Sequence, residues 1–372
     1  MTTTDVVPAS LGRKRRGAIV RMMVLLLVLV IATPLTAQEK KDEKPKPDDT
    51  PSFRIGALFF ADYTYTAEPA SRDSDGNTFH PSAFTVSRAY INVFGTLNHL
   101  ISFRITPESA RETGTGSSLS GSQTYRLKFA YAQFNLDDWL TKGSFIRAGL
   151  LETPYIGWYE GIYRYRFQGT IMVDREGFLI PSDSGVAFHY NFRDDYGDIH
   201  AAVVNGEGFA RSEANNEKAF EVRGTLRPLP KAAVLKGLKI TAYVHRDNYV
   251  AHGPRDRTIA QATFENPRIN AGIDFLSSRD RRGATLPQLE GRGYSIWATP
   301  KLTKGWELLL RHDQLRPDRN VGLRKRDIEG IAYWFAFTSK TPISTAILFD
   351  RDALRAPAGP VTNYGVKMLL SF

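Results

Sequence analysis

The sequence predicts an all-β fold: a transmembrane antiparallel barrel of about sixteen strands, with one long loop folded inward after the fifth strand. Three observations lead to this fold. Apolar and polar side chains alternate with a period of two from Phe53 onward, the connections alternate in length, and the last segment ends on an aromatic residue. The mean hydropathy is −0.30, and no apolar run reaches the roughly 20 residues of a membrane-spanning helix.

The composition excludes several kinds of chemistry. The 372 residues include no cysteine, which rules out a disulfide scaffold, a cysteine-ligated metal and a cysteine nucleophile. Segment 42–49 lacks the glycine and the spacing of a calcium loop, and we find neither a P-loop nor a dinucleotide fingerprint. We therefore predict no catalytic residues, no metal and no cofactor.

The excess of basic residues does not indicate nucleic-acid binding. Lys and Arg number 49 against 39 Asp and Glu, a formal charge of +10. The basic residues alternate with lipid-type residues and do not gather with stacking aromatics on one platform, so we predict no nucleic-acid partner.

The first 37 residues have the pattern of an export signal. The basic stretch 13–16 and Arg21 precede an apolar run from Met22 to Ala32, and small residues around Pro34 lead to a cleavage site near Ala37. The 11-residue length of the run favours a removed export segment over a membrane anchor.

Residues 38–51 are predicted to be a disordered charged leader, since they alternate Lys with Asp and Glu and contain no large apolar residue. The barrel domain then covers 52–372. Residues 1–50 hold 9 basic and 6 acidic side chains, so the remainder carries 40 minus 33, or +7.

Period-two alternation marks about sixteen strands. The segments are 53–65, 83–97, 100–107, 124–136, 144–151, 184–192, 198–205, 217–228, 237–248, 258–264, 268–277, 291–299, 305–313, 326–337, 342–351 and 361–372. The segment at 258–264 is the faintest.

Three segments show which face each side chain takes. In 125–131 the large apolar residues alternate with Arg126 and Lys128, and in 237–245 the apolar face runs from Leu238 to Val244. The last segment places Tyr364 and Phe372 on one apolar face. A terminal aromatic strand is typical of outer-membrane barrels, so we interpret Phe372 as a signal that assembly machinery reads.

The connections predict two different rims, with short turns on one and mostly longer loops on the other. The longest connection, 152–183, follows the fifth strand and is rich in aromatic and charged residues. By analogy with sixteen-stranded pores we expect it to fold inward and narrow the barrel; the alternative is a surface lid whose tyrosines only pack. Its candidate constriction residues are Arg164, Arg166, Arg175, Glu160, Asp174 and Tyr163.

If the apolar faces contact lipid, the opposite faces line a cationic lumen. The predicted basic wall residues are Arg104, Arg126, Lys128, Arg147, Arg223, Arg227, Lys239, Arg268, Arg311 and Lys367. The predicted acidic ones are Glu221, Asp274, Glu307 and Asp313. Ten cations against four anions indicate a positive lumen, and arginine forks suit phosphate and carboxylate oxygens.

Several blocks resemble the phosphate-selective porin O and P family. They are 87–95, 130–134, 147–154, 204–208, 221–228 and the strand pair within 291–312. The resemblance implies a sixteen-stranded porin, a homotrimer, and anion passage along arginines and lysines. The long loop departs from the family pattern because it has three arginines and no lysine.

The sequence thus favours an exported outer-membrane porin, surrounded by lipid, with a weak preference for small anions that could include phosphate. A structural or adhesive barrel with an occluded lumen is the main alternative. A barrel enzyme is a weaker alternative, because the seven histidines form no convincing arrangement with a serine. A secreted β-protein that binds polyanions through its basic surface is another weaker alternative.

Overall fold

The computed structural model describes residues 49–114, 116–337 and 343–372. The predicted export signal and residues 38–48 of the predicted leader lie outside the described residues. Asp49, at the end of that leader, is not free: its carboxylate accepts hydrogen bonds from the backbone N–H of His99 at 3.1 Å and from the ring Nδ1 at 2.6 Å. The unit from Asp48 to Phe372 contains the barrel.

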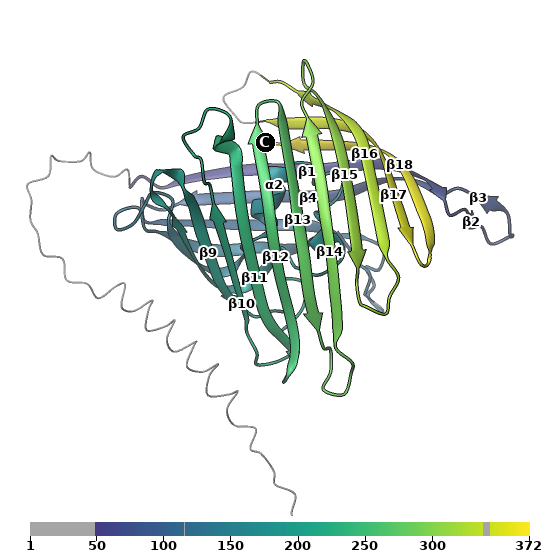
Figure 1. Ribbon diagram of the computed structural model, residues 1–372, viewed down its shortest axis with the longest axis horizontal. Helices are drawn as coiled ribbons and strands as arrows, with labels where there is room; N and C mark the ends of the chain where they lie inside the picture. Colours follow the sequence, from purple (N-terminus) through teal and green to yellow (C-terminus); the bar gives the residue numbers. More distant parts are fainter. Residues whose placement is uncertain (1–48, 115, 338–342) are drawn as a thin grey trace, which may run out of the picture. The chain divides into compact units, whose positions relative to one another are not determined.

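The described residues form a closed antiparallel barrel of sixteen strands (Figure 1). In chain order these are β1 Ser52–Glu68, β4 Ser82–Thr96, β5 Ile101–Arg111, β6 Gln123–Asn135, β7 Phe145–Glu152, β8 Ser182–Asn191, β9 Gly197–Val204, β10 Ala219–Leu226, β11 Leu238–Val250, β12 Gly253–Asn266, β13 Ile269–Asp280, β14 Leu289–Pro300, β15 Trp306–Arg316, β16 Arg324–Phe335, β17 Ser344–Ala356 and β18 Gly359–Ser371. Each strand pairs with its neighbours in sequence, and β1 pairs with β18 to close the sheet. All sixteen predicted strands are confirmed, and the faint segment at 258–264 belongs to the long strand β12.

The remaining elements lie in the connections. A small hairpin, β2 Ser71–Arg72 with β3 Thr78–Phe79, projects away from the barrel after β1 (Figure 1). Two helices, α2 Ile156–Tyr163 and α3 Met172–Arg175, lie between β7 and β8. Two short 3₁₀ turns, Arg193–Asp195 and Leu235–Gly237, precede β9 and β11. Among the described residues, no helix is both long enough and apolar enough to cross a bilayer.

The predicted alternation of connection lengths holds along most of the chain. The rim that receives the connections after β1, β5, β7 and β9, here called the long-loop rim, carries segments 69–81, 112–122, 153–181 and 205–218. Later on the same rim, 281–288 and 317–323 are again longer than the turns 267–268 and 301–305 of the other rim. Only 251–252 and 357–358 are short there, because the β11–β12 and β17–β18 ladders continue almost to the turn. The other rim, the short-turn rim, includes the longer segment 227–237.

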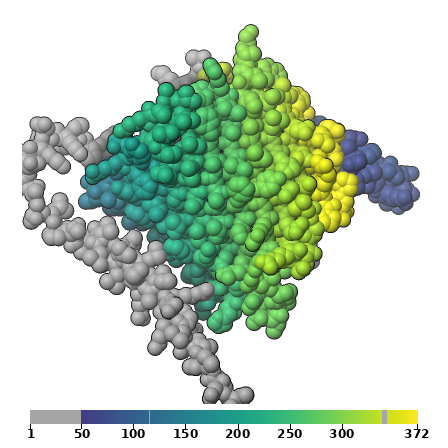
Figure 2. Space-filling model, in the orientation of Figure 1, coloured from purple at the N-terminus to yellow at the C-terminus, as the bar shows by residue number. Residues whose placement is uncertain are grey.

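Outward-facing side chains are apolar over much of the wall. Figure 2 shows the outer surface of the later strands, and the outward residues Ile240, Phe275, Ile296 and Leu310 there are each about half exposed. Their neighbours in sequence point inward and are buried, as the period of two requires. The predicted outward face of 238–244 is confirmed.

The predicted alternation in 125–131 is wrong at one point. Opposite Thr106 and Pro107, β6 contains one extra residue, since Thr106 pairs with Phe129 whereas Pro107 pairs with Leu127. Proline has no N–H to donate to the ladder, so a bulge at this position is expected. The bulge turns Phe129 and Lys128 both to the interior, while Leu127 stays exposed.

The C-terminal residue completes the closure of the barrel. The backbone N–H of Phe372 donates to Ala57 O at 3.1 Å, and the N–H of Ala57 donates to Phe372 O at 3.0 Å. The Phe372 ring is exposed, and Gly56 lies so close to this strand end that an added Cβ would meet Phe372 O at 2.6 Å.

We predict that Phe372→Ala lowers the yield of folded barrel in cells several-fold. The same variant, unfolded and refolded in detergent, should be nearly as stable as the parent, because the ring is exposed and the backbone bonds remain. The folded fraction, measured by heat modifiability in SDS gel electrophoresis, is compared between protein made in cells and protein refolded in detergent. An equal loss in both settings would assign the ring a structural role instead of a signalling one.

Candidate functional site

The connection 153–181, here called the inward loop, lies inside the barrel. Its aromatic and aliphatic residues form one buried cluster with inward side chains of the wall. The loop members are Tyr155, Ile156, Tyr159, Ile162, Tyr163, Tyr165, Phe167, Ile171, Met172, Val173 and Leu179, and the wall members include Tyr243, Trp297, Leu309, Ile328 and Leu348. The inward fold predicted for this loop is confirmed.

Tyrosine hydroxyls anchor the loop to strands β13 to β15. Tyr159 donates to Asp274 Oδ1 at 2.6 Å and accepts from Trp297 Nε1 at 2.7 Å. Tyr165 donates to Glu307 at 3.1 Å. Because these partners are buried, each bond replaces one that water would otherwise supply, and the loop is held firmly against this wall.

The predicted constriction residues divide into two groups. Tyr163, Arg164 and Arg175 turn toward β14 to β17. There Tyr163 accepts from Arg311 at 3.3 Å, the Arg164 guanidinium lies 4.2 Å from the Trp334 ring centre, and Arg175 donates to Gln168 of the loop at 3.1 Å. Burial, reinforced by the like charges of Arg311 and Arg326, lowers the pKa of Arg175 to about 10. Tyr163 and Arg164 therefore attach the loop to the wall, whereas Arg175 binds Gln168 of the loop, which in turn donates to Asp350 of β17 at 3.1 Å.

Glu160, Arg166 and Asp174 face the opposite side, toward β4 to β6. Arg166 pairs with Glu160 at 2.8 Å and donates to Tyr90 of β4 at 2.8 Å. Burial raises the pKa of Glu160 against the lowering effect of Arg166, and it raises the pKa of Asp174 against Arg88. This is the face of the loop that meets the basic wall.

Strands β1 and β4 to β7 carry an excess of inward-facing cations, here called the cationic strip. Its members are Arg54, Arg88, Arg104, Arg126, Lys128 and Arg147. The inward carboxylates of these strands, all of which are described, are Asp62, Glu108 and Glu152, so six minus three leaves +3. Asp62 also lies 3.9 Å from Lys367 of β18.

One group in the strip surrounds Glu108. Arg126 donates to this carboxylate at 2.7 and 2.9 Å, Lys128 donates at 2.8 Å, and Arg88 lies at 3.6 Å. Arg88 and Lys128 also donate to the Tyr90 hydroxyl, at 3.0 and 2.8 Å, as does Arg166 of the loop. A hydroxyl oxygen has two lone pairs, so three cationic donors exceed what Tyr90 can accept. The group therefore has hydrogen-bond donors to spare for an anion.

A second group surrounds Glu152 at the end of β7. Arg104 forms a close ion pair with this carboxylate, and Arg147 lies 3.2 Å from it. Aromatic rings support both guanidinium groups: Arg104 lies 4.3 Å from the Phe129 ring centre and Arg147 lies 4.1 Å from that of Phe145. Two arginines share one carboxylate, which again leaves positive charge in excess.

Water reaches several cations of the strip, whereas the cations beneath the inward loop are buried. The Arg88 and Arg126 side chains are 27% and 46% exposed, whereas that of Arg311 is 1% exposed. Arg311 binds Asp313 at 2.7 Å under the inward loop, and Arg257 binds Asp280 at 2.8 Å. Accessible charge therefore lies on the strip and also on β16, where Arg324 and Arg326 are 43% and 19% exposed and pair with Glu176 and Asp352.

The other predicted wall residues lie elsewhere. Arg223 is buried, binds Asp198, and donates to Pro154 O at 2.8 Å, so it holds the start of the loop. Lys239 pairs with Glu265 near the short-turn rim. Arg227 and Arg268 follow strand ends and lie in turns, outside the pore wall.

The predicted ratio of ten cations to four anions is wrong, because it missed inward carboxylates. Asp247, Asp280, Asp350 and Asp352 all lie on inward faces, and three of them pair with arginines that the prediction also missed. The sequence reasoning overlooked Arg88 and Tyr90 as well. Arg88, Tyr90 and Asn92 are two residues apart, and this spacing could have placed them on one polar, inward face of β4.

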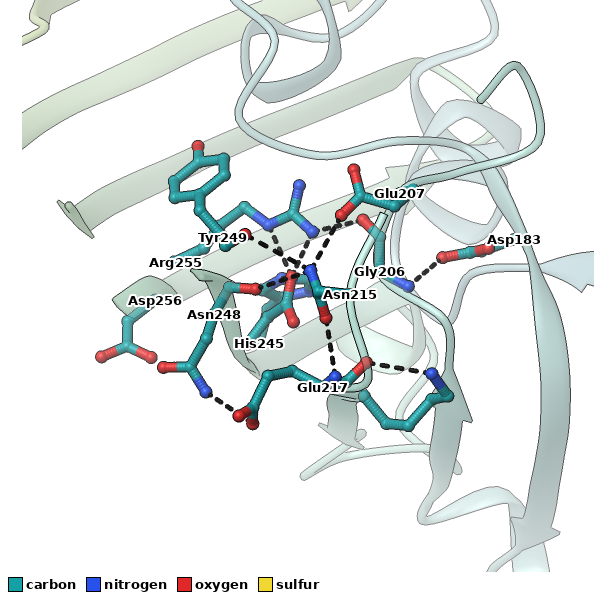
Figure 3. A network of polar contacts seen from close by, with 12 residues as sticks. Asp183, Gly206, Glu207, Asn215, Glu217, His245, Asn248, Tyr249, Arg255 and Asp256 are labelled. Carbon is teal, nitrogen blue, oxygen red and sulfur yellow. Dashed lines mark hydrogen bonds and ion pairs between the residues drawn. The ribbon is translucent and has the colours of Figure 1, made fainter. Parts of the chain in front are cut away.

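The β9–β10 connection covers part of the strip. The Phe209 ring centre lies 4.6 Å from the Arg126 guanidinium and 5.3 Å from Lys128 Nζ. The polar network in Figure 3 holds this connection in place: the N–H of Gly206 donates to Asp183 at 2.6 Å, Arg255 binds Asp247, and Asn215 donates to Glu207 at 3.2 Å. Within the described segments, no group of three or more His, Asp or Glu side chains is arranged as metal ligands.

Comparison with solved structures supports the architecture. The barrel is similar to a loop L8 deletion mutant of OmpT, an outer membrane protein of Vibrio cholerae, with a TM-score of 0.58, 12% identity, and coverage of 87% of this chain and 100% of that one. It is also similar to Salmonella typhi OmpF in complex with daunomycin (0.58, 11%, 86% and 97%) and to the outer membrane channel DcaP of Acinetobacter baumannii (0.53, 13%, 87% and 97%).

No family model and no curated protein matches the chain. Membership of the phosphate-selective porin O and P family therefore stays a prediction. At these identities the structural similarities concern the fold, and they show that the chain has the closed sixteen-stranded barrel of porin-like outer-membrane proteins.

Proposed function

We propose that this protein is an outer-membrane porin through which small polar solutes diffuse passively, with a weak preference for anions. The observation that carries this proposal is the cationic strip, whose partly exposed arginines outnumber their carboxylates and face the inward loop across the lumen. A water-filled passage with low-dielectric walls raises the local concentration of ions of opposite charge.

The preference for anions is weak because most strip cations already have a partner. Glu108 and Glu152 each hold at least two of them. The surplus donors around Tyr90 fit oxygen-rich anions, among which phosphate and carboxylates accept arginine forks well. Phosphate is therefore the first solute to test.

A planar-bilayer experiment tests the proposal. Purified protein is added under a tenfold potassium chloride gradient, and the sign of the zero-current potential gives the preferred ion. We expect discrete conductance steps and a zero-current potential whose sign shows that chloride permeates better than potassium. Millimolar phosphate should reduce the chloride current, whereas strict cation selectivity would contradict the anion preference.

The densely packed inward loop also favours the alternative of an occluded structural barrel, because its large aromatic cluster fills the space beside β11 to β18. A variant with residues 155–179 replaced by a short Gly-Ser linker separates the two functions. We predict that a porin conducts in both forms and that the shortened form conducts several times more. The occluded barrel would be established if the parent protein neither conducts nor lets sugar-loaded liposomes swell, while the shortened form does both.

Three further expectations belong to the same proposal. The chain is placed in the outer membrane by an export signal and by assembly machinery that reads Phe372, it assembles as a homotrimer, and it has no enzymatic activity. Cross-linking of the detergent-solubilised protein measures the number of copies.

A further inference from the structure

The outer surface of β14 to β17 carries an unusual group of cations near the long-loop rim. They are here called the outer patch: Arg292, Arg316, Lys325, Arg351 and Arg355. Each alternates along its strand with inward residues, such as Ser295 of β14 and Leu315 of β15, and therefore points away from the lumen. Strands β14 and β15 lie at the front of Figure 1.

Like charges face each other across two strand pairs in this patch. Arg292 is directly opposite Arg316 in the β14–β15 ladder, and Lys325 is directly opposite Arg355 in the β16–β17 ladder. Directly opposed like charges destabilise a sheet unless something lies between or over them to neutralise them.

The protein itself supplies too few counter-ions here. Asp327 pairs with Arg355 and lies 2.6 Å from His312, and Glu329 lies 3.8 Å from Arg351. Arg292, Arg316 and Lys325 make no ion pair with any residue in the described part of the chain. Glu290 also lies on this face, one outward position from Arg292, and pairs with Arg319. With that pair counted, six cations against three carboxylates leave +3 on one small area, which indicates an anionic partner.

An apolar groove begins where the patch ends. The groove has a volume of about 570 Å³, and its floor consists of outward residues of β11 to β15, including Phe264, Ala271, Ile296, Ala298 and Leu310. His312, Asp327 and Glu329, which lie beside the patch, line its other end. The small side chains of Ala271 and Ala298 hollow the wall between the bulkier residues. The outer patch and the apolar groove therefore adjoin on one outer surface of the barrel.

Tyr294 indicates the level at which this surface lies in the membrane. It lies one outward position below Arg292 on β14, and its ring centre is 5.8 Å from that of His312. Aromatic side chains of this kind are typical of the level where lipid headgroups meet the hydrocarbon layer.

We propose that this surface binds a lipid whose phosphorylated headgroup has a net negative charge, with the phosphate over Arg292, Arg316 and Lys325 and an acyl chain in the groove. The patch alone would suit free phosphate, but the adjoining apolar groove suits a molecule with both a charged and a hydrocarbon part. A second copy presenting the same face would bring another +3 against the first, so it does not supply the missing negative charge.

The test measures lipid retention by the full-length barrel in detergent, using native mass spectrometry with added phosphatidylglycerol or phosphatidylcholine of identical acyl chains. We expect tighter binding of phosphatidylglycerol to the parent. The Arg292→Gln/Arg316→Gln variant should bind it roughly 25-fold more weakly, at about fivefold for each cation removed near an anionic lipid surface.

Two variants serve as controls. Lys231→Gln/Lys236→Gln removes the same charge from the short-turn rim and should leave phosphatidylglycerol binding unchanged. Arg292→Lys/Arg316→Lys keeps the charge and should retain most of the binding.

Three results would each overturn the proposal. The first is equal affinity of the parent for both lipids. The second is displacement of phosphatidylglycerol by inorganic phosphate at equal concentration, which would make the patch a simple anion site. The third is a change in the number of copies in the Arg292→Gln/Arg316→Gln variant, which would make the surface a protein interface.

Discussion

Replacing Arg88 and Arg126 together by glutamine should shift the ion preference of the channel from anions toward cations. Both arginines lie on the exposed part of the cationic strip, and Glu108 keeps Lys128 as its partner when they are removed. A charge near a conduction path changes the energy of a passing ion by about 1 kcal/mol, so we expect the chloride-to-potassium permeability ratio to fall about fivefold or more. Zero-current potentials under a salt gradient measure this ratio.

The matched control for this experiment is Arg246→Gln/Arg279→Gln. These two arginines point outward from β11 and β13, so the variant removes the same charge from the other side of the wall. Its permeability ratio should equal that of the parent. Equal shifts in both variants would show that the net charge of the protein sets the preference and that the strip has no special part in it.

Glu108→Ala should destabilise the barrel by about 3–5 kcal/mol, the usual cost of leaving a buried charge without its partner. The side chains of Glu108 and Lys128 are 2% and 1% exposed, so water cannot replace the lost carboxylate. Denaturant unfolding followed by tryptophan fluorescence in detergent measures the change in the free energy of unfolding.

Glu329→Ala is the comparison for Glu108→Ala. Its side chain is 60% exposed and lies 3.8 Å from Arg351, so its removal should change the free energy of unfolding by less than about 1 kcal/mol. If the two variants unfold alike, the ion pairs around Glu108 do not support the strip as we describe.

The sequence predicted the barrel well because period-two alternation depends on one local rule, applied strand by strand. Segments 198–205 and 268–277 begin within a residue of β9 and β13. The rule failed in β6, where one extra residue opposite Pro107 reverses the faces. The cause lies in the neighbouring strand, and the alternation of β6 alone cannot show it.

The candidate site was harder to predict, because pairing across the lumen is a property of the closed barrel. Arg104, Arg126, Lys128 and Arg147 come together on one wall as expected. Arg311 has the same alternation but lies beneath the inward loop. Alternation gives the direction of a side chain, and the path of the loop decides whether water reaches it.

Because the inward loop is attached to β13 to β15, charge is distributed unevenly around the passage. The arginines of the strip border it on one flank, and on the other lie Glu160 and Asp174 of the loop with Arg166, which leaves one negative charge there. A dipolar solute entering this space experiences a sideways electric field and turns its negative end toward β4 to β6. Elongated zwitterions should consequently travel in a preferred orientation, so that two isomers of equal size and net charge pass at different rates.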